Sequence, residues 1–201
     1  MQTLLKKSED IMAEIRTLVE AACRAKTNVF GYGIFTHHIL PVVSYSKAFA
    51  HERNANEEIV ELAAWLHDYA NIKGDCAIGE HHIAGAAEAE KILKELNYSS
   101  EKIHHVKECI LAHRGSVSVS QKSLEALCLS DADALAHFDG IPSLFHYLYV
   151  FEQKSVDEAI EWLRAKLERS WNKLSPEAKE LARPKYEMSI LLLDNKPTVV
   201  R

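Results

Sequence analysis

Residues 62–70 have the sequence LAAWLHDYA, an apolar run that is interrupted by an adjacent histidine and aspartate. Its apolar residues continue a spacing of three and four that predicts an α-helix over about residues 56–69. His67 and Asp68 end the apolar stripe at its C-terminal end. Burial of an ionisable side chain is costly unless the group is paired or coordinates a metal. The two residues are therefore candidate metal ligands on a buried helix.

The same periodicity recurs along the chain, and glycine (7) and proline (5) are scarce. No alternating pattern long enough for a sheet is present, so we predict an all-α bundle of about seven to nine helices in a single domain, 1–201. Candidate N-caps are Thr36, Asn56 or Asn54, and Ser175. Pro41 is tolerable near a first helical turn, and residues 71–79 should form a loop. The predicted helices cover about residues 8–26, 37–51, 56–69, 81–96, 100–114, 121–137, 141–152, 155–172 and 176–193.

Composition excludes several classes of protein. The 201 residues are 47% hydrophobic and 26% charged, as in ordinary soluble domains. The net charge is −5, and no Lys/Arg cluster forms the basic face that long nucleic acids require. No segment approaches the roughly 20 apolar residues of a membrane span, and the N-terminus lacks a signal-peptide core, so we expect a cytoplasmic protein. The four cysteines are widely spaced: Cys23, Cys76, Cys109 and Cys128. They form no CxxC pair, which disfavours both a zinc knuckle and a disulfide framework.

Five consecutive predicted helices each place an imidazole or a carboxylate on the apolar face. A lone buried histidine is usually a hydrogen-bonded core residue, but five helices doing so together favour a metal site. Imidazole and carboxylate ligands suit Fe, Mn, Zn, Co or Ni, and no thiolate is needed. The residues that end or interrupt these apolar stripes are His38, His67, Asp68, His82, His113 and Asp133.

His38, the pair His67-Asp68 and the distant Asp133 resemble the H…HD…D signature of the HD superfamily of metal-dependent phosphohydrolases. The resemblance spans about residues 37–140, with helices 141–193 packing on the same core. It implies one divalent ion held by these four residues. Residues 129–138, LSDADALAHF, resemble the family's DAD-containing helix, and this assigns the ligand role to Asp133 rather than Asp131.

Two further segments resemble the H…HD…H…H…D subgroup of this family. They are HHIAGAAEAEKIL (81–93) and ECILAHR (108–114), in which His82 and His113 fit the additional positions. In that subgroup the two histidines can hold a second metal, bridged by Asp68. With a single metal they would instead bind the substrate phosphate or transfer a proton. The sequence leaves both possibilities open.

The resemblance implies that metal-activated water attacks a phosphate ester, with Asp68 orienting that water. Lys73 and Arg114 are candidates to neutralise the phosphate charge, and His137 and Asp139 to contact the substrate. Some relatives have a lysine where this chain has Asn71, which leaves the general acid unassigned. The remaining histidines should have no role in the site: His37, His81, His104 and His105 are expected to point away from the stripes, and His51 ends a helix.

The expected substrate is a small phosphate ester such as a nucleotide, and the expected partners include neither a membrane nor a long nucleic acid. A homodimer is possible. Two alternatives share the ligand set: an HD-fold di-iron oxygenase, and a non-catalytic metal-binding module. Two irons per chain with oxygen consumption would identify the first, and a closed pocket the second.

Overall fold

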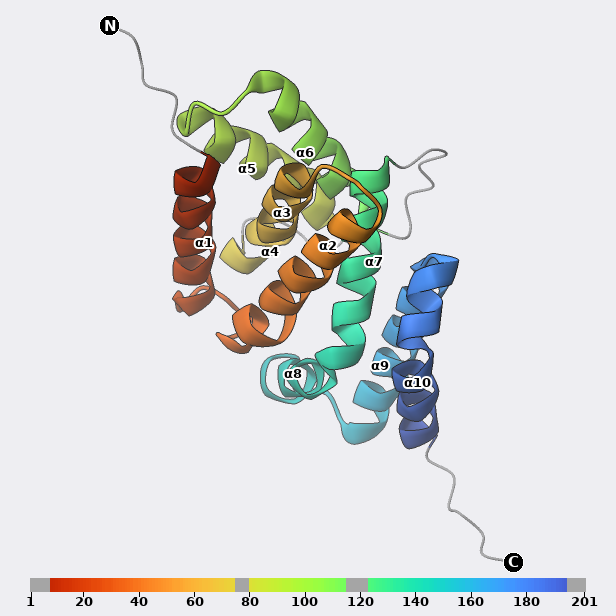
Figure 1. The fold of residues 1–201 in the computed structure, drawn as a ribbon. Coiled ribbons are helices and arrows are strands. Elements are labelled where there is room, and N and C mark those ends of the chain that lie inside the picture. Colours follow the sequence, from red (N-terminus) through yellow and green to blue (C-terminus); the bar gives the residue numbers. More distant parts are fainter. Residues whose placement is uncertain (1–7, 75–79, 115–122, 195–201) are drawn as a thin grey trace, which may run out of the picture.

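The structure, a computed structural model, describes residues 8–74, 80–114 and 123–194. The predicted all-α fold is confirmed, because these residues form helices and no strand (Figure 1). The elements are α1 (Ser8–Arg24), the π-helix η1 (Phe35–Ile39), α2 (Leu40–Glu52), α3 (Glu57–Leu66), α4 (Tyr69–Lys73), α5 (His81–Glu95), α6 (Ser100–Ala112), α7 (Leu124–Asp139), α8 (Ile141–His146), the π-helix η3 (Tyr147–Phe151), α9 (Val156–Lys173) and α10 (Pro176–Leu193).

Two helices, α3 and α7, form the centre of the core. In α3 the Asn56 side chain accepts a hydrogen bond from the Ile59 amide at 3.2 Å, which caps the helix as predicted. All but one of the residues from Ile59 to Leu66 are buried. In α7 the Ser123 hydroxyl caps the first turn, and residues 128–138 are all buried. Helices as apolar as these on every face are stable only when other helices surround them.

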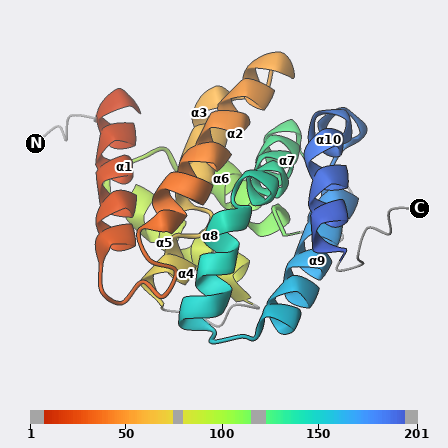
Figure 2. The ribbon, with the colours of Figure 1, turned by 90° about the horizontal axis from the view of Figure 1, so that it is seen from below.

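The other helices surround this centre. Helices α2 and α3 lie between α1 and α7, whereas the α9–α10 pair covers the opposite side of α7 (Figures 1 and 2). Helix α5 packs against α6, and α6 in turn contacts α3 and α7. Buried residues from α1 through α10 belong to one hydrophobic cluster. The C-terminal helices therefore share the core that holds the site.

The start of the second predicted helix differs from the expectation. Thr36 is not an N-cap: it lies inside η1, where the Leu40 amide bonds to the Phe35 carbonyl, five residues back. The reason is Pro41, which has no N–H to donate to the His37 carbonyl and whose ring would clash with it in an α-helix. A π-turn accommodates this break, and such turns occur frequently at functional sites. The π-helix carries His38.

Other boundaries also differ from the predictions. The expected loop 71–79 begins with the short helix α4, which ends at Gly74 in the left-handed conformation (φ 79°); residues 75–79, with Cys76, lie outside the described residues. The predicted helix 141–152 is α8 followed by η3. None of the described helices combines the length and apolar character needed to cross a lipid bilayer.

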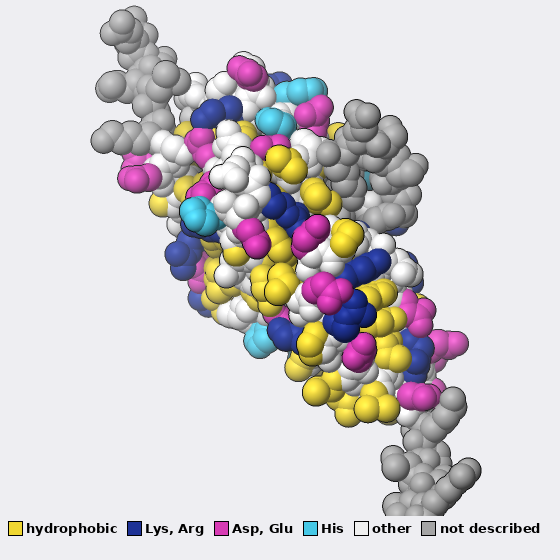
Figure 3. Space-filling view, turned by 45° about the vertical axis from the view of Figure 1, so that its right-hand side comes forward, with side chains coloured by type: hydrophobic (Ala, Val, Ile, Leu, Met, Phe, Trp, Pro, Cys, Tyr) yellow, Lys and Arg dark blue, Asp and Glu magenta, His cyan; other side chains and the backbone are white. Residues whose placement is uncertain are grey.

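Hydrophobic side chains gather on one face near the C-terminal end (Figure 3). Helix α10 exposes four large apolar side chains: Leu181, Met188, Leu191 and Leu192. The homodimer expected from the sequence stays a prediction.

Candidate metal centre

His67 and Asp68 lie just beyond the last turn of α3 and reach the interior because that helix is buried. The His67 Nδ1 lies 2.8 Å from the Ala64 carbonyl oxygen, so Nδ1 carries the proton and Nε2 faces the cluster. His67 is fully buried. A backbone carbonyl that fixes the tautomer in this way is the usual outer partner of a metal-bound histidine.

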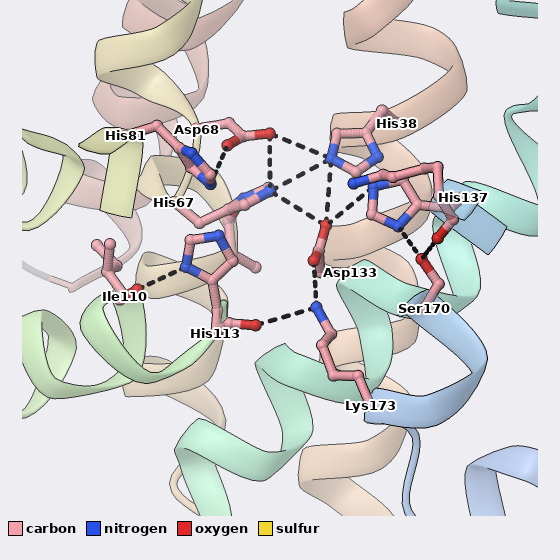
Figure 4. A network of polar contacts seen from close by, with 12 residues as sticks. His38, His67, Asp68, His81, Ile110, His113, Asp133, His137, Ser170 and Lys173 are labelled. Carbon is pink, nitrogen blue, oxygen red and sulfur yellow. Dashed lines mark hydrogen bonds and ion pairs between the residues drawn. The ribbon is translucent and has the colours of Figure 1, made fainter. Parts of the chain in front are cut away.

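Four side chains from η1, the turn between α3 and α4, and α7 meet at this point and form the first cluster: His38, His67, Asp68 and Asp133 (Figure 4). The Asp68 Oδ2 lies 3.3 Å from the Nε2 atoms of both His38 and His67. The two Nε2 atoms are 3.4 Å apart, and the Asp133 Oδ1 lies 3.5 Å from His38 Nε2. The Asp133 Oδ1 lies 3.9 Å from His67 Nε2. Two ligands bound at about 2.1 Å to one ion are separated by roughly 3.0–4.2 Å, depending on the angle between them. The spacing therefore fits a single divalent cation.

The chemistry of the facing atoms also fits a cation. With its proton on Nδ1, neutral His67 directs a lone pair from Nε2 at the carboxylate of Asp68. Two acceptor atoms at 3.3 Å need a proton or a cation between them. Burial alone would lower the pKa of His67, but Asp68 and Asp133 raise it to about 9. A metal ion would take the place of that proton.

A second cluster lies on the other side of Asp68: Asp68, His81 and His113, whose ligand atoms are within 4.8 Å of one another. The Asp68 Oδ1 lies 3.9 Å from His81 Nε2. The His113 Nδ1 lies 2.5 Å from the Ile110 carbonyl, so its Nε2 is also left as the ligand atom. Burial lowers the pKa of His113 to about 3, so the ring is neutral at ordinary pH. The two oxygens of Asp68 thus face one cluster each.

The structure corrects the sequence prediction about His81 and His82. His81, expected to point away, faces Asp68, whereas His82, the predicted ligand, is buried outside both clusters with no hydrogen-bond partner for its Nδ1. The cause is Gly85, one turn after His81. A Cβ on Gly85 would lie 2.8 Å from the His67 carbonyl oxygen, so α5 approaches α3 on its glycine face. A glycine leaves no mark in an apolar pattern. The predicted stripe of His82, Ala86, Ala89 and Leu93 is buried as expected, but the face of α5 that meets α3 and Asp68 runs through Gly85 and His81.

Helix α9 supplies a cation to the first cluster. The Lys173 Nζ lies 2.5 Å from Asp133 Oδ2 and 3.0 Å from the His113 carbonyl oxygen. Burial alone would raise the pKa of Asp133, but the Lys173 ammonium lowers it well below its usual range. Asp133 is therefore ionised, with one oxygen held by Lys173 and the other facing the histidines.

His137, predicted from the sequence to contact the substrate, lies beside Asp133 and lines the cavity described below. The Ser170 hydroxyl donates to the Lys166 carbonyl at 3.1 Å, so it accepts from the His137 Nδ1, 3.0 Å away. The His137 Nε2 therefore carries a lone pair, 3.6 Å from Asp133 Oδ1. Burial lowers the pKa of His137 well below its usual range, which keeps the ring neutral.

Three other predicted residues lie away from the cavity lining. Both oxygens of Asp139 are engaged, one by the Tyr45 hydroxyl at 2.5 Å and the other by Lys185, so this carboxylate links α2, α7 and α10. Lys73 pairs with Glu88 at 3.2 Å, and Arg114 is also absent from the lining. The sequence pattern could not distinguish these surface or structural contacts from contacts with a substrate.

A cavity of about 180 Å³ opens onto both clusters. A water molecule needs about 10–15 Å³ by this measure, so the space holds a small ligand rather than a few waters. Its lining combines metal-cluster residues with apolar and aromatic side chains from residues 30–34 and from α8, η3 and α9. Among the lining residues are His38, Asp68, His81, His113, Asp133, His137, Asn71, Phe30, Ile34, Ser143, Leu144, Tyr147, Trp162 and Lys166.

The model of the HD domain family matches residues 35–137, just over half of the chain. The chain belongs to the HD-domain family. The matched segment contains the first cluster of this HD-domain protein in full, from His38 to Asp133, and it ends before α8. Lys166 and Lys173 lie outside it and have no counterpart in the motif, which is why sequence reasoning missed them.

Solved structures share the fold of this HD-domain protein over nearly its whole length. YpgQ of Bacillus subtilis, in complex with ADP, is 22% identical with a TM-score of 0.68, over 96% of this chain and 98% of YpgQ. An HD-superfamily hydrolase of Bacillus thuringiensis is 20% identical with a TM-score of 0.67, over 94% of this chain and 95% of its own. A predicted HD superfamily hydrolase from an uncultured Thermotogales bacterium is 19% identical with a TM-score of 0.59, over 90% of this chain and 88% of its own. No curated protein matches the sequence.

Proposed function

We propose that this HD-domain protein is a metal-dependent phosphohydrolase that cleaves a phosphomonoester or phosphodiester bond of a small substrate, a nucleotide or a related phosphate ester. The observation that carries the proposal is the position of Asp68. Its two oxygens face two clusters of imidazole and carboxylate ligands at the end of a cavity. That arrangement suits one or two divalent ions of Fe, Mn, Zn, Co or Ni placed against a bound ligand.

The chain's own residues would hold and orient the reacting groups. His67 and His113 present fixed Nε2 atoms because backbone carbonyls hold their Nδ1 protons. A divalent ion bound there lowers the pKa of a coordinated water and polarises a phosphoryl oxygen. Asp68 lies between the clusters, where its carboxylate would orient an attacking water. The neutral His137, with its Nε2 lone pair beside Asp133, can accept a hydrogen bond in the same space.

Two lines of support favour a phosphate ester of nucleotide type. Similar structures include HD-superfamily hydrolases, and YpgQ has been crystallised with ADP. The cavity also has a polar end at the clusters and aromatic walls from Phe30, Tyr147 and Trp162, as a flat organic group requires. A non-catalytic scaffold would have no need of such a cavity.

The test begins with the metal content of protein purified without chelator. Wild type should contain a transition metal that the His67→Ala/Asp68→Ala double variant loses. His104→Ala is the matched control, because His104 is an exposed histidine of α6, and it should retain the metal. Phosphate release from nucleoside mono-, di- and triphosphates and from p-nitrophenyl phosphate should then depend on added Mn²⁺.

The outcomes separate the alternatives. Retention of all metal by the double variant would overturn the proposed site. Metal without phosphate release, but with two irons per chain and oxygen consumption, would identify an oxygenase instead. Metal with neither activity would indicate a binding module.

A further inference from the structure

Helix α9 places one lysine in the cavity itself. Lys166 lines the cavity together with His137 and Asp133, and it lies outside the segment that matches the HD family. The side chain is partly buried. Lys173, two turns further along the same helix, is held by Asp133, so the two lysines have different surroundings.

Among the described residues, no carboxylate lies within ion-pair distance of the Lys166 ammonium. Most of the other partly buried lysines that the structure describes do have a carboxylate partner. Burial lowers the pKa of Lys166, with the charge of Asp133 opposing that effect from a greater distance. A partly buried ammonium without a partner is costly, and a ligand that brings negative charge relieves the cost. In this cavity such a ligand would lie next to the metal clusters.

Trp162 lies one turn before Lys166 on α9 and lines the same cavity. Residues four apart share a helix face, so the indole and the ammonium are neighbours. Phe30 and Tyr147, with ring centroids 5.0 Å apart, also line the cavity. A cation beside aromatic surface matches a molecule with a phosphate at one end and a flat apolar group at the other.

We infer that Lys166 binds the phosphate of the substrate beside the metal clusters, while Trp162 contacts its flat organic group. The inference rests on the proposed function and replaces Lys73 and Arg114, which do not line the cavity, as the cation for the phosphate. A charge-assisted hydrogen bond contributes about 1.5–3 kcal/mol, so its loss should weaken phosphate binding about 10- to 100-fold.

The experiment measures binding by calorimetry on Mn²⁺-loaded protein, with inorganic phosphate, ADP and adenosine as probes. Lys166→Met should weaken phosphate and ADP about 10- to 100-fold and leave adenosine and metal content unchanged. Lys166→Arg should retain most of the phosphate affinity. Arg169→Met is the matched control, since it removes an exposed positive charge from the same helix. Trp162→Ala should weaken ADP and adenosine and leave inorganic phosphate unchanged.

Lys166→Gln is a second neutral variant in case Lys166→Met does not fold. Wild-type affinity for phosphate in a folded neutral variant would overturn the role of Lys166, while metal-dependent phosphate release by wild type would leave the proposed function standing. If metal-loaded wild type binds neither phosphate nor ADP, the inference fails, and the proposed function fails with it only if none of the phosphate esters releases phosphate either.

Discussion

The Lys173 ammonium lies 2.5 Å from Asp133 Oδ2, while the Asp133 Oδ1 lies 3.5 Å from His38 Nε2. One carboxylate is thus shared between a cation from α9 and the first cluster. Both side chains are nearly buried. In the metal-free protein Lys173 supplies part of the positive charge that a metal ion would bring, and it also restricts Asp133 to one free oxygen.

Replacing Lys173 should therefore affect the metal-free protein most. Removal of one partner of a buried ion pair costs about 3–5 kcal/mol, which corresponds to a decrease in Tm of roughly 6–20 °C at this chain length. We expect Lys173→Met to show such a decrease in EDTA and a smaller one with Mn²⁺, because the ion then neutralises Asp133. Thermal unfolding under both conditions measures this. An equal decrease in both would show that the lysine acts only through packing.

Metal binding should release a proton from His67. Its pKa of about 9 in the metal-free protein lies above the ordinary value of 6.5, so the charged ring adds stability below pH 6.5 that is lost as the pH rises toward 9. Metal affinity should change in the opposite direction and increase over that range. Calorimetry at pH 7.5 in buffers of different ionisation enthalpy should give close to one proton released per ion in the first cluster. A release near zero would contradict the protonated state of His67.

His81 and His82 should differ in their effect on metal content. Only His81 faces Asp68, at 3.9 Å, so His81→Ala should reduce a content of two ions per chain to about one. His82→Ala, its neighbour on α5, should keep both ions in the folded protein. Elemental analysis of the two purified variants measures this directly. If His82→Ala instead lost an ion and His81→Ala kept both, His82 would be the ligand, as the sequence predicted.

Asp131 and Asp133 are two residues apart on α7 and should separate stability from metal binding. Asp131 is fully buried and accepts hydrogen bonds from Arg53 Nη2 at 2.7 Å and from the amide and hydroxyl of Ser175 at 2.9 and 2.6 Å. Asp131→Ala should cost about 3–5 kcal/mol of unfolding free energy, since it leaves the partly buried Arg53 guanidinium without a carboxylate partner. The folded fraction should keep its metal, whereas Asp133→Ala should lose it. Urea unfolding measures the loss of stability, and metal analysis on the same samples measures the metal that each variant retains.

Much of the first cluster could be predicted from the sequence because helical periodicity and a short motif specify it. His67 and Asp68 end the stripe of a helix that is buried all around, and Asp133 occupies the buried face of α7. The family resemblance also chose Asp133 over Asp131, and the structure places Asp133 in the cluster. Whether each of these residues faces the core depends mostly on the orientation of its own helix. The spacing of apolar residues along that helix predicts this orientation.

Helical periodicity and the short motif were therefore enough to predict the all-α fold, the approximate positions of most helices and the residues of the first cluster. The tertiary structure decided which face of α5 meets Asp68, because the close approach at Gly85 turns His81 inward. It also decided that Asp139 joins three helices and that α9 brings Lys166 and Lys173 to the site. Those outcomes depend on how separate helices pack against one another, and local periodicity carries no information about the partner that a polar side chain finds across the interface.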